Sequence, residues 1–269
     1  MNSKIIEAGE LKKIQLDILV SVDNFCRRHN IRYFLAYGTL IGALRHKGYI
    51  PWDDDIDIAM PRPDYEKFIK SYGKEGNDTY YVLSPDSDKL YPYTFAKICK
   101  SGTHITEFSS LKYDLGVNID LFPIDGLPAG KAEIKSHYSK ICFYRDCLNV
   151  KRIKLDFKKR SLQKNCILTL AKVALWPVPY RALINKIVNL SKKYSYSESC
   201  FAADLNFGNE NRCLPKTIFE QDVPVEFENH RFPAPVGYDR WLRVIYGEYM
   251  QLPPLEKQVT HHAMKAYYN

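Results

Sequence analysis

The chain has 269 residues, of which 45% are apolar and 13% aromatic, so it can bury one substantial core and does not have the composition of a disordered protein. It shows no charged-then-apolar leader with a small-residue cleavage site, and no uncharged apolar run reaches the roughly 18 residues that a membrane-spanning helix needs. We therefore expect a globular protein that stays in the cytoplasm.

The seven cysteines are an odd number and contain no Cys-x-x-Cys pair. This pattern favours reduced thiols in a reducing compartment over a disulfide framework. A zinc site built from thiolates lacks its usual paired spacing, although Cys200 and Cys213 with a distant histidine remain an alternative. We therefore do not expect a structural zinc.

The formal net charge of +8 is unevenly distributed along the chain. Residues 131–200 hold 16 Lys and Arg against 4 Asp and Glu, whereas the rest of the chain holds 23 against 27. A basic segment of this kind attracts anionic partners such as phosphorylated glycans, lipid head groups or nucleic acid. A solvated helical face is the alternative, and charge patterning alone does not separate the two.

The first elements are a helix, a strand and a second, short helix. Apolar residues recur every three or four positions over 11–25, which predicts an amphipathic helix up to about Arg28. Residues 31–37 are aromatic and β-branched enough to form a strand that ends at Gly38. Thr39 is then expected to cap a helix over the next seven residues.

A strand with alternating character follows over residues 55–59, and Pro61 is expected to end it. Residues 63–70 predict a helix with acidic residues in its first turn, which should cover one face of a sheet. Further short strands are expected at residues 80–83, 94–100 and 117–122. The first half of the chain is therefore predicted to be a mixed α/β core.

Residues 131–195 have apolar residues at helical spacing, with breaks near 151–156 and at Pro177 and Pro179. They predict a basic helical subdomain. Its most apolar piece, residues 166–176, is too short to cross a bilayer. We expect it to be a buried core helix, with a helix lying at a membrane interface as the alternative.

Beyond residue 206 the regular pattern weakens, apart from a short helix expected over 241–249. The sequence thus predicts three segments. These are a catalytic core over 1–130, the basic helical subdomain over 131–200, and a C-terminal segment over 201–269 that returns to the core.

Four nearly contiguous acids, Asp53, Asp54, Asp55 and Asp57, repel one another unless a cation lies among them or they point apart into water. Divalent cations that prefer hard oxygen ligands resolve this conflict. Because strand residues alternate between faces, Asp55 and Asp57 are expected to share a metal while Asp54 points elsewhere. Taken alone, an exposed acidic turn is the better interpretation.

The context of these acids favours chemistry over an acidic turn. Gly38 and Thr39 stand upstream at a strand-to-helix turn, where free backbone N–H groups and the helix dipole can hold a phosphate. Asp120 lies between apolar neighbours in a predicted strand and is the candidate for a third carboxylate. Asp125 is an alternative that we expect instead to begin an Asp-Gly turn.

Two segments make the pattern specific. Residues 37–46 (YGTLIGALRH) and 50–57 (IPWDDDID), with Gly48 between them, resemble the LicD family of phosphotransferases. This family is similar to phosphocholine transferases and to fukutin-related sugar-phosphate transferases. Weaker similarity extends over 95–98 (FAKI), 119–125 (IDLFPID) and 246–254 (YGEYMQLPP).

The resemblance implies a nucleotidyltransferase-like fold that moves a phosphorylated alcohol from a cytidine diphosphate donor onto a glycan hydroxyl. Phosphocholine is the first expectation, with ribitol or glycerol phosphate as alternatives, and the acceptor would be a teichoic acid, lipopolysaccharide or capsule precursor. By position, Asp55 and Asp57 match the metal-binding pair, Asp120 the third acid, and Gly38 and Thr39 the phosphate loop. The cofactor would be Mg²⁺, with Mn²⁺ as an alternative, and two ions are expected.

Several further side chains have candidate roles. Lys97 and Arg45 are expected either to neutralise donor phosphate or to be surface charges. Trp52 could stack on cytosine, cap a quaternary ammonium or pack in the core. His46 is interpreted as a structural hydrogen-bonding residue. At most one of the adjacent His261 and His262 is expected to reach the site. Asp53 and Asp54 are further candidate members.

The expected partners are a CDP-linked donor and a lipid-linked saccharide acceptor, with residues 131–200 as the place of acceptor or membrane specificity. Peripheral contact with the inner membrane surface is part of this expectation. Nucleotide addition to RNA is a rival enzyme hypothesis, but no stacking signature or RNA-binding module is present, so we expect no nucleic acid. A non-catalytic glycan or membrane adaptor is disfavoured, because buried acids without a cation are costly.

Overall fold

The computed structural model describes residues 4–74, 78–106, 113–156, 160–260 and 265–269. A mixed sheet with the strand order β2-β3-β7-β5-β4 lies at its centre, and β8 and β9 continue it from the end of β7. Strands β3 and β7 are parallel, and the other neighbouring pairs are antiparallel. The bounds are β2 Phe34–Leu35, β3 Asp57–Pro61, β4 Tyr80–Leu83, β5 Ala96–Lys100, β7 Asn118–Leu127, β8 Phe201–Ala203 and β9 Leu214–Pro215.

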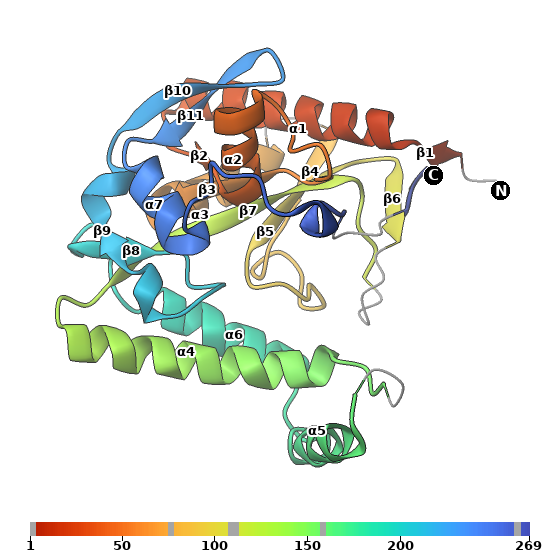
Figure 1. Cartoon of the computed structure of the whole chain (residues 1–269), viewed down its shortest axis with the longest axis vertical. Helices are drawn as coiled ribbons and strands as arrows, with labels where there is room; N and C mark the ends of the chain where they lie inside the picture. The colour runs from red at the N-terminus through yellow and green to blue at the C-terminus, as the bar shows by residue number, and fades with distance from the viewer. Residues whose placement is uncertain (1–3, 75–77, 107–112, 157–159, 261–264) are drawn as a thin grey trace.

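Helices pack on this sheet (Figure 1), which confirms the predicted mixed α/β class. The predicted amphipathic stripe of α1 is buried, and α1 contacts β5 and β7, while α3 contacts β3 and β7. The left-handed residue Asn30 ends α1. The helices of this part are α1 Ala8–His29, α2 Tyr37–His46, α3 Arg62–Ser71 and α7 Tyr238–Tyr246, with short 3-10 turns at Tyr72–Lys74, Glu210–Arg212, Lys216–Phe219 and Leu255–Lys257.

Two smaller sheets complete the core. The hairpin of β10 (Asp222–Phe227) and β11 (His230–Pro235) lies beside β2 and α2. Strands β1 (Ile5–Ile6), β12 (Lys265–Tyr268) and β6 (Thr103–Thr106) form the other sheet. Because β1 pairs with β12, the first and last strands lie side by side (Figure 1).

The predicted helices of the basic segment are present, as α4 (Lys131–Arg152), α5 (Leu162–Ala174) and α6 (Tyr180–Ser191). Figure 1 shows α4 and α6 beneath the sheet and α5 beyond α4. Side chains of α4 and α6 form an apolar cluster with residues at the end of β7 and around β8, separate from the larger cluster around the sheet. The division of the chain at residues 130 and 200 stays a prediction.

Three local expectations in the first half were wrong. Helix α2 begins at Tyr37, and Thr39 is no cap, because its Oγ1 accepts a hydrogen bond from the Asp57 backbone N at 2.8 Å. The strand around the acids begins at Asp57, so Asp55 precedes it. Strand β7 runs through Pro123, which lies in a gap between its pairing with β5 and its pairing with β8, where a missing N–H costs little.

Asp125 does not begin a turn. It lies inside β7, and its two carboxylate oxygens accept hydrogen bonds of 2.6 and 2.8 Å from Arg62 at the start of α3. The Asp125 side chain is 1% exposed and the Arg62 side chain 12%. The expected turn is therefore wrong, and the acid is neutralised by a structural ion pair.

Helix α5 is not a buried core helix, as the sequence had led us to expect. Its side chains Ile167, Leu170 and Val173 are 67%, 70% and 64% exposed, and Trp176 just beyond it is 85% exposed. Across the described residues, no helix combines the length and the hydropathy that crossing a bilayer requires.

Candidate active site

The predicted acids Asp57 and Asp120 are neighbours across the parallel strands β3 and β7. Residues that pair directly across a sheet point to the same face, and the apolar residues on either side of each acid are buried. The antiparallel strand β5 adds Lys97 opposite Asp120 on the other side. The register thus produces a row of two carboxylates and an ammonium on one face of the sheet.

Lys97 is tied to this row and is 6% exposed. Its Nζ lies 2.5 Å from Asp120 Oδ1 and 3.2 Å from Asn118 Oδ1, and it also lies over the ring of Tyr93, 4.9 Å from the centroid. Such a charge-assisted bond holds a carboxylate in one orientation. Lys97 therefore positions Asp120, and its predicted contact with donor phosphate stays a prediction.

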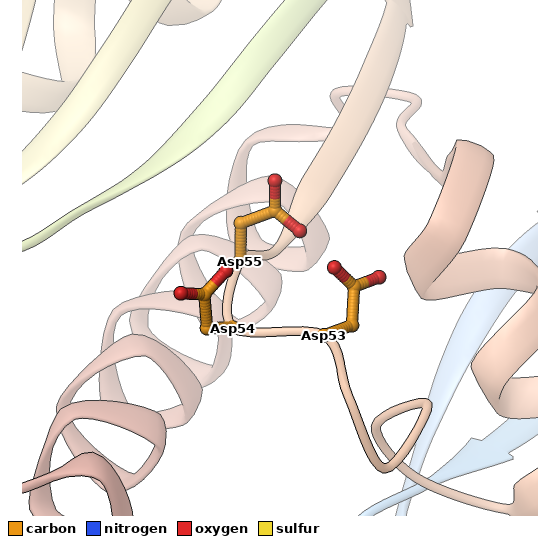
Figure 2. Close-up of side chains that lie close together, drawn as sticks. All are labelled: Asp53, Asp54 and Asp55. Carbon is orange, nitrogen blue, oxygen red and sulfur yellow. The ribbon is translucent and has the colours of Figure 1, made fainter. Parts of the chain in front are cut away.

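The loop before β3 brings three further carboxylates together. Asp53, Asp54 and Asp55 each offer an oxygen that lies within 4.8 Å of the others, and they are the group of three metal-type ligands that the described part of the chain contains. Figure 2 shows the Asp53 and Asp55 carboxylates projecting to the same side of this loop. The backbone carbonyl of Asp54 accepts a hydrogen bond of 2.9 Å from Gln15 of α1, which anchors the loop.

These charges act on Asp57. Burial raises the pKa of the Asp57 carboxyl well above its usual range, the charges of Asp55, Asp120 and Asp53 raise it further, and Lys97 lowers it. Like charges at short range disfavour ionisation of each other. The acids of the loop and of the strands therefore form one electrostatic group with an excess of negative charge.

The start of α2 lies against this group. A Cβ atom at Gly38 would come within 2.6 Å of Asp53 Oδ2, so only glycine lets the carboxylate approach the helix this closely. The preceding residue, Tyr37, has a left-handed backbone with φ 47° and donates its hydroxyl to the buried Asp204. A helix N-terminus favours negative charge, which stabilises Asp53 at this place.

A cavity of about 840 Å³ opens beside the acids, between α2, the acidic loop and the C-terminal segment that follows α7. Asp53, Asp55 and Asp57 line its acidic side, together with Gly38. The opposite wall comes from residues 246–259. This cavity is large enough for a small-molecule ligand.

Arg45 of α2 connects the two walls of the cavity through hydrogen bonds to the C-terminal segment. Its guanidinium donates 2.8 and 3.2 Å hydrogen bonds to the backbone carbonyls of Tyr249 and Gln251, and a 2.9 Å bond to His46 Nε2. Burial lowers the pKa of Arg45 from its usual value. His46 is thus a hydrogen-bond partner of Arg45, whereas Trp52 lines the cavity and also packs on the core.

The predicted site residues fall into three groups. Gly38, Arg45, Trp52, Asp53, Asp55 and Asp57 share the cavity, and Asp120 and Lys97 join through the strand register. Thr39 is 3% exposed and bonds to β3. His261 and His262 lie outside the described residues. The catalytic, metal-binding and phosphate-binding roles of these residues all stay predictions.

Sequence reasoning did not single out Tyr246, Lys257 or Asn118. Tyr246 lines the cavity at the end of α7, and the pKa of its phenol is raised by burial and then by the charges of Asp57, Asp53 and Asp55. Lys257 is an exposed cation on the same wall. The similarity of residues 246–254 to the LicD family was the available signal, but nothing in it assigned a role to one side chain.

A family model for the LicD/FKTN/FKRP nucleotidyltransferase domain matches residues 30–180, which is more than half of the chain. The chain belongs to the LicD/FKTN/FKRP family. The resemblance inferred from residues 37–57 is thereby confirmed. The aspartates of the site lie within the matched LicD domain, whereas the wall formed by residues 246–259, which carries Glu248 and Glu256, lies outside it.

Curated relatives agree with this membership. The chain is 34% identical over 274 aligned positions to the lipopolysaccharide cholinephosphotransferase LicD of Haemophilus influenzae, and the match covers 98% of this chain and 99% of that protein. It is also 27% identical over 141 positions to an uncharacterized protein of Rickettsia typhi, covering 49% of this chain and 45% of that protein. A 37-residue stretch is 51% identical to an uncharacterized protein of Rickettsia prowazekii, covering 14% of each.

Proposed function

We propose that this LicD-family chain transfers phosphocholine from CDP-choline onto a sugar hydroxyl of lipopolysaccharide in the presence of Mg²⁺. The activity named for the Haemophilus influenzae relative, which matches nearly end to end, supports the reaction class and the acceptor. The observation that carries the proposal is the set of Asp53, Asp55 and Asp57 on one side of an 840 Å³ cavity, with Asp120 paired to Asp57 across the sheet.

The residues of this site fit a divalent cation. Carboxylate oxygens are the ligands that Mg²⁺ prefers, and the excess negative charge that raises the Asp57 pKa is what a cation relieves. Asp55, Asp57 and Asp120 would hold it, with Asp53 as a further ligand at the cavity wall. When bound, such an ion supplies charge neutralisation at the donor pyrophosphate and lowers the pKa of the acceptor hydroxyl.

The protein's own groups account for donor binding and proton transfer. Arg45 and Lys257 offer positive charge to the donor phosphates, and Trp52 offers a ring face to the cytosine or to the quaternary ammonium. The acceptor oxygen forms a bond to the phosphorus that carries choline, the bond from that phosphorus to the CMP oxygen breaks, and CMP leaves. Asp120, oriented by Lys97, accepts the proton of the hydroxyl.

Purified protein tests the reaction directly. With CDP-choline, lipopolysaccharide and Mg²⁺, we expect CMP release together with a choline-sized mass increase of the glycolipid. Asp57→Asn should lower kcat/KM by at least about a hundredfold while the circular dichroism spectrum stays unchanged, because it removes a charge needed in the transition state. The matched control is Glu226→Gln, an exposed acid on β10.

Two results would contradict the proposal. Near-wild-type turnover of Asp57→Asn would remove the assignment of the acids to the reaction. CMP release from CDP-ribitol or CDP-glycerol but not from CDP-choline would keep the phosphotransfer and replace the alcohol.

A further inference from the structure

Polar contacts hold helix α5 to the rest of the protein. Asn165 is fully buried, and its Nδ2 donates to the carbonyls of Asp156 at 3.1 Å and Arg160 at 3.2 Å. Lys172 Nζ donates to the Lys151 carbonyl at 3.1 Å, and Lys151 Nζ donates to a carbonyl at the end of α5 at 2.7 Å. Hydrogen bonds to α4 and to the preceding loop therefore hold this helix.

The outward side of α5 is apolar. Leu162, Leu170 and Val173 are each at least 64% exposed and lie within about 80° of one another around the helix, because successive residues are about 100° apart. Ile167 and Trp176 extend this face, with exposed fractions of 67% and 85%. A surface helix of a globular protein normally shows the reverse arrangement.

No described element covers this face. Figure 1 shows α5 as the outermost element, beyond α4 and away from the sheet. The link before it also exposes apolar side chains, with Ile153 at 37% and Leu155 at 40%. Contiguous exposed apolar surface of this kind marks a docking site.

The charge around α5 selects the kind of surface that would cover it. Lys154 before α5 and Lys164 in its first turn are exposed, within a segment of 16 basic against 4 acidic residues. Two copies of such a segment repel each other, whereas an anionic bilayer attracts it. Tryptophan is also enriched at the level of lipid head groups, and Trp176 stands at the end of the helix.

We propose that α5 docks the protein on an anionic lipid bilayer, lying in the plane of the interface with Leu162, Ile167, Leu170, Val173 and Trp176 inserted. Thirteen residues are too few to span a bilayer, but an exposed apolar helix face within a basic segment is typical of an interfacial helix. This inference rests on the exposed face and its charge, not on the reaction proposed above.

Vesicle flotation of the full chain tests the docking. We expect the protein to float with vesicles of phosphatidylethanolamine and phosphatidylglycerol, to float much less with phosphatidylcholine alone, and to be released by molar salt. The double variant Leu170→Glu, Val173→Glu should lower the bound fraction by at least about tenfold, because each apolar side chain is replaced by a charge.

Ile5→Glu is the matched control. Ile5 is 57% exposed on β1, which lies on the sheet side of the molecule away from α5 (Figure 1), so this variant should float like the wild type. Both sets of changes are at exposed positions, and the melting curves of all variants should coincide with that of the wild type.

Fluorescence gives a second measurement. The chain has three tryptophans; Trp241 is 4% exposed and Trp52 is partly buried in the core, so Trp176 reports on the solvent. Emission should shift to shorter wavelength on addition of anionic vesicles. Trp176→Phe should abolish the shift while the variant still floats.

Three outcomes would overturn the proposal. The wild type could fail to float with anionic vesicles, or the double variant could float as well as the wild type. A dimer in light scattering that Leu170→Glu, Val173→Glu converts to a monomer would assign the face to a second copy of the chain instead.

Discussion

His137 in α4 is a buried histidine that the fold keeps neutral. It is 3% exposed, its Nε2 has no hydrogen-bond partner within the described residues, and its ring packs edge-on against Tyr194. Burial, followed by the positive charges of Lys193 and Lys140, lowers its pKa from 6.5 to about 4. Below pH 6.5 the unfolded chain therefore binds a proton that the folded chain does not.

This difference predicts a pH dependence of stability. The contribution is fully present above pH 6.5, the unfolded pKa, and is lost as the pH falls toward 4. Between pH 7 and pH 4.5 the wild type should lose about 2–3 kcal/mol more free energy of unfolding than His137→Phe. Urea unfolding at pH 7 and pH 4.5 measures this loss in the wild type and in His137→Phe. Equal losses in the two proteins would rule out a contribution of His137 to the pH dependence.

At the scale of elements, the Arg62–Asp125 pair joins the first turn of α3 to the C-terminal part of β7. Both side chains are largely withdrawn from water, and the two hydrogen bonds satisfy both carboxylate oxygens. Burying two charges is costly, so the pair need not add stability over an apolar contact. Removing only one of the two charges leaves the other buried without a partner, and this destabilises the folded protein.

Arg62→Met should therefore lower the free energy of unfolding by about 3–5 kcal/mol, because it leaves the Asp125 charge buried without a partner. Arg27→Met is the matched control: Arg27 bonds to Asp23 from a side chain that is 63% exposed. That loss should stay below about 1 kcal/mol. Chemical denaturation measures the free energy of unfolding of both variants. Similar losses would show that breaking the buried Arg62–Asp125 pair costs no more than breaking an exposed pair.

At the scale of the whole molecule, the buried apolar side chains form two separate clusters. The larger lies around the sheet and includes Ile58 next to Asp57, whereas the smaller lies between α4 and α6 and includes Ile187. Both side chains are at most 1% exposed. The acids and the cavity belong with the larger cluster.

Ile187→Ala and Ile58→Ala should each cost about 2–5 kcal/mol in unfolding free energy through the cavity they leave. Their effects on the proposed CMP release should differ when both are assayed well below their melting temperatures. Ile187→Ala should keep activity within about twofold, whereas Ile58→Ala should lower it at least about tenfold by shifting β3. Equal activities of the two variants would argue against a site that depends on the sheet alone.

The sequence by itself determined the local periods and the family. The apolar stripe of α1, the alternation around Asp57 and Asp120, and the three helices of the basic segment could all be inferred, because side-chain period follows directly from backbone geometry. The motif over residues 37–57 likewise contains the family resemblance within one continuous stretch.

Only the tertiary structure decided which parts of the protein those residue faces contact. The register that sets Asp57 beside Asp120 and Lys97, the bonds from Arg45 to a wall some 200 residues away, and the pairing of Arg62 with Asp125 join parts of the chain with no local signal. In α5 the period was correct but the apolar face points outward. Periodicity tells which residues share a face; whether protein, water or another surface covers that face depends on how the rest of the chain packs.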